Sequence, residues 1–402
     1  MNGPIDGGWT PLRRRVVAIC TLINALDGMD VLIMSYVAPA MAADWTIGFE
    51  MMGLVFSVGL GGMVIGCLLV APFADSIGRR PIVLMPLMMM SAGMLGTGLA
   101  SSLTPFLIAR IVAGIGIGAL LASIAALTAE YAPPGRTSLA IGLFQAGYPI
   151  GAVLTGLASI AAIPTFGWQA TLLGAGCISL AVLPIAWIGL PESRGFLEAG
   201  KESRKAATPP VGALFIAARW RSTLALWGAT FAGFAVLYFI TSWIPRLAIE
   251  AGLAPGAALW AGTIFNLGGC VGATAIGWLA IGTPIARLIR LFLGAAAILL
   301  LLFSAPLPLA PILLIAFGIG LTLQGGFSGF YALCAELYPP EMRSSGTGWA
   351  VGIGRGGAIL GPALGGMLLA AKMPLWAVFL SFAVPLILSG ALAVLAARLR
   401  AR

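Results

Sequence analysis

Long apolar stretches without a charged side chain recur along this chain of 402 residues. A helix that crosses the hydrocarbon core of a bilayer needs about 20 such residues. Two segments are each long enough for two helices: 137–191 and 291–335. Two more carry no charge except for two Asp and one Arg: 16–42 and 346–370. The other charge-free stretches are 51–74, 81–109, 111–129, 222–245, 251–286 and 373–397. The sequence therefore predicts an all-α integral membrane protein with twelve transmembrane helices in two six-helix halves.

The composition excludes the soluble classes of protein. Hydrophobic residues make up 60% of the chain and charged residues 9%, whereas about 25% of a soluble domain is charged. A soluble fold could not cover so much apolar surface, so a soluble enzyme, a nucleic-acid-binding domain and a disordered protein are excluded. The chain has no His, and its five Cys stand singly without a CxxC pair. We therefore expect no metal site, no cofactor and no disulfide framework.

Lys and Arg are distributed unevenly between the predicted loops. With the N-terminus placed in the cytoplasm, all of them except Arg110, Arg246, Arg355 and Lys372 fall in cytoplasmic segments. This asymmetry follows the positive-inside rule, and an even number of spans places both termini inside. The net charge of +9 is thus explained by topology in the inner, cytoplasmic membrane, and no nucleic-acid partner is expected.

One sizeable hydrophilic segment, residues 191–222, divides the chain. It predicts a six-helix half over 1–190, a cytoplasmic central loop over 191–222 and a second six-helix half over 223–402. The halves match weakly at an offset of 206, which aligns Glu130 with Glu336 and the Pro-Pro pair at 133 with that at 339. Two parallel halves around a central site are typical of secondary transporters.

The loop after the second predicted span resembles the signature loop of the major facilitator superfamily, G-x-L-x-D-R-x-G-R-(R/K). The plain alternative is a turn with positive-inside residues. The resemblance implies a cytoplasmic latch, with Asp75 at the N-terminus of the eleventh span near Ser344, where a helix dipole favours an anion. The matching residues are Asp75, Gly78, Arg79 and Arg80, and the further gating candidates are Glu130, Arg136, Glu336 and Arg343.

An acidic pair, Asp27 and Asp30, lies inside the first predicted span. Ionisable groups at membrane depth are unfavourable and are functional by default, and this spacing puts both on one helix face. The segment resembles the D-G-x-D of aromatic acid:H⁺ symporters. Two further stretches, Glu336 to Pro340 and the Gly-Arg-x-Gly around Arg355, are similar to other motifs of that family. A structural pair is the alternative. We expect Asp27, Asp30 and Arg110 to couple protons, with an Asp30–Arg110 pair that opens on protonation.

Arg355 lies near mid-membrane in the eleventh predicted span. It is expected to bind a substrate carboxylate as a bidentate fork, and an ion-pair partnership is the alternative. Aromatic side chains in the seventh and tenth spans could stack on a substrate ring, although ordinary helix packing also explains them. The other candidate substrate contacts are Gln145, Tyr148, Tyr238, Asn266, Gln324 and Tyr331.

These features together predict a proton-coupled symporter that imports a small organic anion by alternating access. The resemblance implies an aromatic carboxylate of the hydroxybenzoate or phenylpropanoid type. Protons, the anion and the bilayer are the expected partners, and a monomer is expected. A symporter of an aliphatic carboxylate and an H⁺-coupled drug or metabolite exporter remain alternatives. A membrane enzyme would need a catalytic constellation in its loops, and outside residues 191–222 the loops are short and hold no His, Cys or paired carboxylates.

Overall fold

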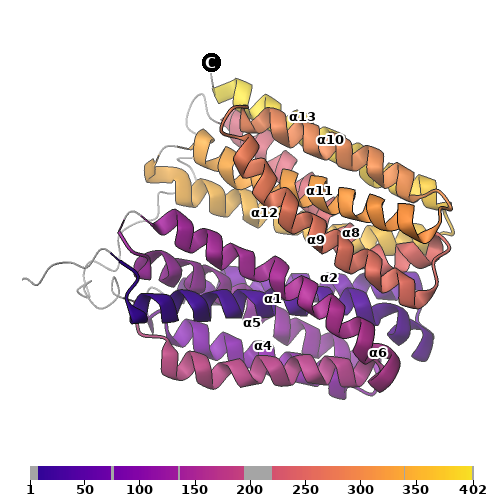
Figure 1. Ribbon diagram of the computed structural model, residues 1–402, viewed down its shortest axis with the longest axis horizontal. Helices are drawn as coiled ribbons and strands as arrows, with labels where there is room; N and C mark the ends of the chain where they lie inside the picture. The colour runs from indigo at the N-terminus through magenta and orange to yellow at the C-terminus, as the bar shows by residue number, and fades with distance from the viewer. Residues whose placement is uncertain (1–7, 74–76, 135, 194–219, 339, 401–402) are drawn as a thin grey trace, which may run out of the picture. The chain divides into compact units, whose positions relative to one another are not determined.

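The computed structural model describes residues 8–73, 77–134, 136–193, 220–338 and 340–400, and over these residues the chain is helical without a β-strand (Figure 1). Eleven helices in this part are long and apolar enough to cross a membrane. They are α1 (Pro11–Asp44), α2 (Phe49–Ile65), α4 (Pro81–Leu99), α5 (Leu103–Tyr131), α6 (Thr137–Gly189), α8 (Trp220–Glu250), α9 (Pro255–Leu279), α10 (Ile285–Phe303), α11 (Leu309–Leu337), α12 (Pro340–Ala370) and α13 (Leu375–Arg400). A π-helical turn, η1 (Gly66–Val70), and a 3₁₀ turn, η2 (Ala71–Phe73), extend α2.

The helix α6 is too long for a single crossing. It has 53 residues, and Gly167 inside it adopts φ 82° and ψ 169°, which is not a helical conformation. A glycine adopts positive φ without the steric penalty that a Cβ brings. Figure 1 shows that the chain reverses direction within α6, as expected for a segment long enough for two helices. The element therefore consists of two helices that meet at Gly167.

The chain divides into two compact units. Unit 1 comprises residues 1–33 and 58–206, and unit 2 comprises residues 34–57 and 207–402. The turn between α1 and α2, with the adjoining ends of both helices, therefore belongs to unit 2. There Phe56 meets the ring of Trp243 at 5.2 Å between centroids, and Ser57 donates a 2.7 Å hydrogen bond to the carbonyl of Ile359.

Glycines allow close helix packing in unit 1. A Cβ at Gly114 or Gly118 of α5 would overlap the backbone carbonyl of Gly59 or Met63 of α2. Gly116, on another face of α5, approaches the carbonyl of Pro86 in α4, and a Cβ there would come within 2.5 Å. Small residues at such crossings let helix backbones approach in a membrane, where no hydrophobic effect drives helices together.

Unit 2 uses the same device. The helix α9 packs on α11, and α12 packs on α8, while α13 contacts both α8 and α10. Gly268 and Gly272 of α9 lie against the backbone of α11, and Gly357 and Gly361 of α12 lie against that of α8.

Two helices begin before the apolar stretches from which their spans are predicted, although the candidate membrane span within α12, residues 346–370, is the predicted one. The helix α12 begins at Pro340, so Ser344 lies in its second turn and is not at the N-terminus where a dipole would act. The helix α5 begins at Leu103, so Arg110 lies in its third turn and not at the edge of the span. Both extensions recruit polar or Pro-containing segments that hydropathy alone assigns to loops.

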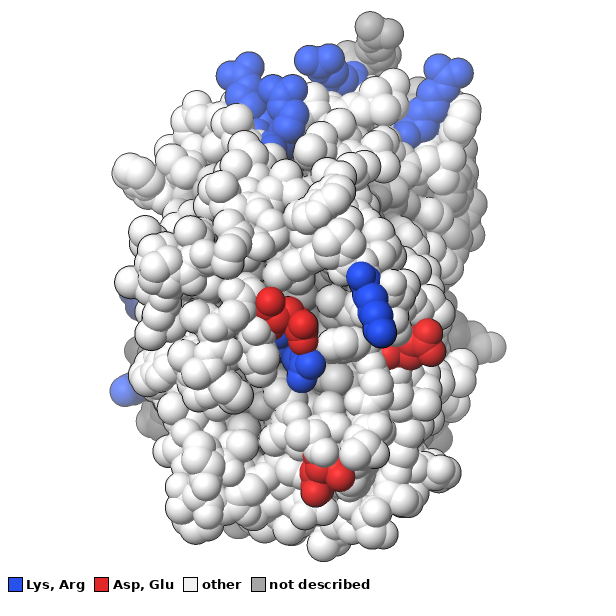
Figure 2. All heavy atoms as spheres, turned by 90° about the vertical axis from the view of Figure 1, so that its right-hand side faces the viewer, with Lys and Arg blue, Asp and Glu red and all other residues white. Residues whose placement is uncertain are grey.

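The outer surface is largely apolar, as contact with lipid requires. Large side chains such as Ile188, Leu314 and Leu69 are 80%, 73% and 64% exposed. Figure 2 looks onto the helix ends at the right of Figure 1, and there Lys, Arg, Asp and Glu are few and scattered among uncharged residues.

Candidate functional site

The acidic pair of α1 lies inside unit 1. Asp27 and Asp30 are 4% and 1% exposed. Gly28 between them sits against the backbone carbonyl of Tyr148 in α6, where a Cβ would overlap it. One turn earlier, Asn24 donates a 2.8 Å hydrogen bond to the carbonyl of Phe144. The glycine and the asparagine thus fix the crossing of α1 and α6 at the level of the carboxylates.

Arg110 of α5 meets Asp30 in the arrangement that the sequence hypothesis proposed. Its two terminal nitrogens donate hydrogen bonds of 2.7 and 3.0 Å to the two carboxylate oxygens. Their side chains are 6% and 2% exposed. Bidentate, charge-assisted bonds are among the strongest polar contacts in proteins. Removing one partner would leave an uncompensated charge in a buried place.

Gly59 of α2 provides the space for this guanidinium. A Cβ at Gly59 would lie 3.0 Å from a terminal nitrogen of Arg110 and 3.4 Å from its Nε. Gly59 is not among the predicted site residues, because one glycine in a glycine-rich span carries no distinguishing signal.

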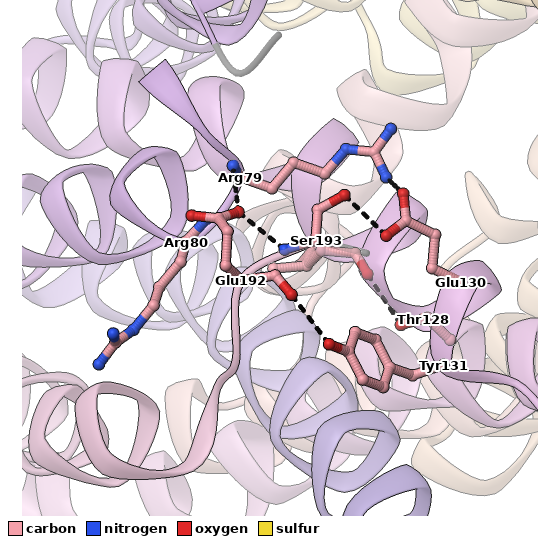
Figure 3. A network of polar contacts seen from close by, with 8 residues as sticks. Arg79, Arg80, Thr128, Glu130, Tyr131, Glu192 and Ser193 are labelled. Atoms are coloured by element: carbon pink, nitrogen blue, oxygen red, sulfur yellow. Dashed lines mark hydrogen bonds and ion pairs between the residues drawn. The ribbon is translucent and has the colours of Figure 1, made fainter. Parts of the chain in front are cut away.

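A second polar cluster lies where the loop after η2 meets the end of α6 (Figure 3). Glu192 is its centre: the carboxylate Oε1 accepts hydrogen bonds from the backbone N–H groups of Arg79 (2.8 Å), Arg80 (3.1 Å) and Ser193 (2.8 Å). Gly78 has φ 110°, and a Cβ on it would lie 2.6 Å from Oε2 of Glu192. The loop therefore wraps around this carboxylate, and a glycine is required where it turns.

The same cluster holds the end of α5. Arg79 forms an ion pair with Glu130, and the hydroxyl of Ser193 donates a 2.8 Å bond to the other oxygen of Glu130. Tyr131 donates a 2.8 Å hydrogen bond to the carbonyl of Glu192 (Figure 3). The cluster thus joins the ends of three helices of unit 1.

The predicted gating residues divide into three groups. Gly78, Arg79, Arg80 and Glu130 meet in this cluster. Arg136 and Glu336 are exposed. Asp75 and the side chain of Arg343 lie outside the described residues, so the predicted latch through Asp75 stays a prediction. Glu192, Ser193 and Tyr131 are not among the predicted gating residues, although the Pro-Glu-Ser at 191–193, directly after a long apolar segment, is a signal that could have indicated two of them.

Aromatic side chains gather inside unit 2. Phe234 and Tyr238 of α8 lie nearly parallel, with centroids 6.1 Å apart. Phe327 of α11 meets Phe234 edge-on at 4.6 Å, and Tyr331 follows at 5.9 Å from Phe327. A Cβ at Gly354 would lie 2.7 Å from the Phe234 ring, so this glycine brings α12 against the aromatic cluster.

Arg355 lies next to that glycine, half-buried and midway along α12. Tyr331 of α11 is 41% exposed. Asn266 is buried, and Gln324 donates a 3.4 Å hydrogen bond to its Oδ1. The structure thus gathers Tyr238, Asn266, Gln324, Tyr331 and Arg355 in unit 2. Gln145 and Tyr148 belong to α6 of unit 1, where Gln145 is exposed and Tyr148 half-buried.

Among the described residues there is no group of three or more Cys, Asp or Glu side chains that could hold a metal ion. Charged groups inside the apolar helices instead include Asp27 and the Asp30–Arg110 pair of unit 1 and the half-buried Arg355 of unit 2. An apolar helical bundle with these groups inside it has the properties of a membrane transport protein.

Comparison with known proteins places the chain within that class. The profile of the Major Facilitator Superfamily matches residues 18–350, and the chain belongs to this superfamily. It is 33% identical to the gallate transporter of Pseudomonas putida, covering 96% of this chain and 92% of the relative. It is 32% identical to a 4-hydroxybenzoate transporter of Acinetobacter baylyi, covering 88% and 84%. The predicted resemblance to transporters of aromatic acids is confirmed.

Solved structures agree on the fold. A crystal structure of a bacterial homologue of the human lysosomal transporter Spinster superposes with a TM-score of 0.81 over 97% of this chain and 98% of that one, at 18% identity.

Proposed function

We propose that the protein is a proton-coupled symporter that imports an aromatic carboxylate, of the hydroxybenzoate or phenylpropanoid type, by alternating access. The gallate and 4-hydroxybenzoate relatives support the substrate class. The bidentate pair of Arg110 and Asp30 carries the coupling part of the proposal, because a buried carboxylate is held there by a partner that can be released.

The proposed topology has twelve crossings, with α6 crossing twice around Gly167. Both termini lie in the cytoplasm, and the protein acts as a monomer in the inner membrane. The Lys and Arg residues of the short loops support this orientation, and the non-helical backbone at Gly167 supports the twelfth crossing.

Protonation of Asp30 is the proposed coupling step. A neutral carboxyl loses most of its attraction for the Arg110 guanidinium, so the pair weakens when the proton arrives and reforms when it leaves. Asp27, one turn away on the same helix, provides a second proton site. The packing of Gly28 on α6 couples any movement of this part of α1 to α6.

Arg355 is the proposed anchor for the substrate carboxylate. Arg355 is half-buried midway along α12, and its neighbour Gly354 packs against Phe234 of the aromatic cluster, which supports a site that can receive a substrate ring. A carboxylate accepts two parallel hydrogen bonds from arginine, which lysine cannot reproduce. The alternative role, an ion-pair partner, needs only the charge.

Uptake by proteoliposomes tests this function. With an inward proton gradient, labelled 4-hydroxybenzoate and a phenylpropanoid acid should accumulate, and a protonophore should abolish the accumulation. Arg355→Lys should raise KM at least about tenfold, since a bidentate charge-assisted fork is lost. The matched control is Arg246→Lys, at the far end of α8 in a 2.8 Å pair with Glu250, which should leave KM unchanged.

Accumulation of short dicarboxylates in place of aromatic acids would contradict the substrate class. Net export driven by the same gradient would contradict the direction. A near-normal KM in Arg355→Lys would show that Arg355 is an ion-pair partner and that the carboxylate is bound elsewhere.

A further inference from the structure

A group of polar side chains lies inside unit 2, between α1, α9 and α11. Asn266 of α9 is 1% exposed. Its Nδ2 donates a 2.9 Å hydrogen bond to the carbonyl of Gly262, which leaves Oδ1 to accept from Gln324 at 3.4 Å. Tyr36 of α1 and Thr263 of α9 lie beside it, with their hydroxyls 3.5 Å apart. Buried amide and hydroxyl groups in a membrane-spanning segment are unfavourable unless they are hydrogen-bonded within the protein or to a ligand.

The carboxamide of Gln324 has hydrogen-bond donors and an acceptor that its contact with Asn266 does not use. A carboxamide offers two N–H donors and a carbonyl acceptor. Among the residues that the structure describes, the side chain of Gln324 makes only the hydrogen bond to Asn266. Its Oε1 and its second N–H are therefore available to a ligand. Gln324 is half-buried, and an amide turned to lipid would be unfavourable, so its open side suits a polar ligand.

The position of Gln324 depends on Gly269. A Cβ at Gly269 would overlap the carboxamide of Gln324, and the three atoms nearest to that Cβ all belong to this carboxamide. The glycine thus leaves a recess in α9 into which the end of the Gln324 side chain fits. Asn266, three residues earlier on α9, holds the same group by its hydrogen bond.

One face of α11 carries Gln324, Phe327 and Tyr331, at spacings of three and four residues. Phe327 packs against Phe234, and Gly354, the neighbour of Arg355 on α12, packs against the same ring. Gln324 and Tyr331 are two helical turns apart, about 10 Å along the axis. The face therefore carries aromatic rings, which adjoin the proposed anion site of α12, and an unused carboxamide.

A ring acid with a hydroxyl opposite its carboxylate has the same order of groups. We propose that Gln324, positioned by Asn266 and Gly269, binds the ring hydroxyl of the substrate and sets a preference for hydroxylated over unsubstituted aromatic acids. The phenolic O–H donates to Oε1 of Gln324, and the phenolic oxygen accepts from its free N–H. This inference rests on the proposed function and adds a selectivity that a carboxylate-binding arginine alone does not provide.

The test compares kcat/KM for 4-hydroxybenzoate with kcat/KM for benzoate in proteoliposomes. In the wild type the ratio should be about tenfold or more in favour of the hydroxylated acid, the size of one or two hydrogen bonds. Gln324→Met keeps the length of the side chain and removes the hydrogen bonds, so the ratio should fall close to one. The loss should appear as a higher KM for 4-hydroxybenzoate while benzoate kinetics stay unchanged.

Two further variants separate recognition from misfolding. Gly269→Ala leaves Gln324 in the chain but fills its recess, so the ratio should fall in the same direction. Gln169→Met changes an exposed glutamine of α6 and should keep the wild-type ratio. If Gln324→Met does not reach the membrane, the ratio of kcat/KM values measured for Gly269→Ala tests the inference in its place.

A wild-type ratio near one, or an unchanged ratio in Gly269→Ala and Gln324→Met, overturns the inference while the proposed function stands. A wild type that takes up neither acid overturns the proposed function and this inference with it.

Discussion

The guanidinium of Arg110 and the carboxylate of Asp30, 80 positions apart in the sequence, share two hydrogen bonds inside unit 1. A buried ion pair adds little to stability compared with apolar residues of similar size, because both charges must be desolvated. Retention of such a pair in an apolar span is best explained by a need to open and close it. The proposed coupling mechanism supplies that need.

Replacing Asp30 should separate coupling from transport. Asp30→Asn keeps the shape but cannot exchange a proton, so accumulation driven by a pH gradient should be abolished. Exchange of labelled for unlabelled substrate across the membrane needs no net proton movement and should persist. The lone Arg110 charge should destabilise the folded protein by about 3–5 kcal/mol, measured as a lower Tm in detergent.

The double variant Asp30→Asn/Arg110→Gln is the control for that loss of stability. It removes both charges, so Tm should recover towards the wild type while accumulation stays absent. Continued accumulation in Asp30→Asn would show that another group carries the proton. Accumulation by Asp27→Asn would then show whether that group is Asp27.

Gly59 should prove to be a positioning residue for the pair. In Gly59→Ala the new Cβ would lie 3.0 Å from a terminal nitrogen of Arg110, so the guanidinium must shift from Asp30. We expect gradient-driven uptake to fall several-fold and its pH profile to move, with exchange little affected. Gly61→Ala, in the same helix with no atom within 4 Å of its Cβ, should behave as the wild type. An unchanged pH profile in Gly59→Ala would mean that Arg110 tolerates displacement.

Glu192 should stabilise the polar cluster at the end of α6 through hydrogen bonds more than through charge. Its Oε1 accepts from three backbone N–H groups. Glu192→Ala removes this acceptor and should lower stability by about 1.5–3 kcal/mol, as for hydrogen bonds to a charged group. Glu192→Gln keeps a carbonyl oxygen and should lose less than half as much, measured by thermal unfolding in detergent. Equal losses in the two variants would assign the effect to charge.

Much of the fold could be predicted from the sequence, because lipid contact imposes apolar stretches of fixed length on every span. The same logic predicts two helices within residues 137–191, and the structure has a non-helical residue, Gly167, inside this segment. Helix ends were less predictable. The helices α5 and α12 continue through segments with Ser, Arg and Pro, since tertiary contacts and not hydropathy decide where a helix ends.

The candidate site was predictable where a single residue is unusual for its environment. Asp27, Asp30 and Arg355 are charges in apolar spans, and this alone selects them. Glu192 and Gly59 carry no such signal. Glu192 is an ordinary loop carboxylate until the fold brings three N–H groups to it, and Gly59 is one of 55 glycines until Arg110 reaches its surface. Their roles arise from contacts distant in sequence, which spacing cannot reveal.

The response of uptake to membrane potential should reveal how many protons accompany each anion. A monoanion that enters with one proton moves no net charge, whereas entry with two protons moves one positive charge inward. That charge is worth about 2.3 kcal/mol per 100 mV, or about fiftyfold in accumulation, since about 1.4 kcal/mol is tenfold. Because Asp27 and Asp30 are both buried in one span, we expect two protons.

Potassium gradients clamped with valinomycin should then raise wild-type uptake when the interior is negative. Asp27→Asn, with one carboxyl left, should still accumulate substrate under a pH gradient but should no longer respond to the potential. Wild-type uptake that ignores the potential would limit the stoichiometry to one proton and leave Asp27 outside the proton path.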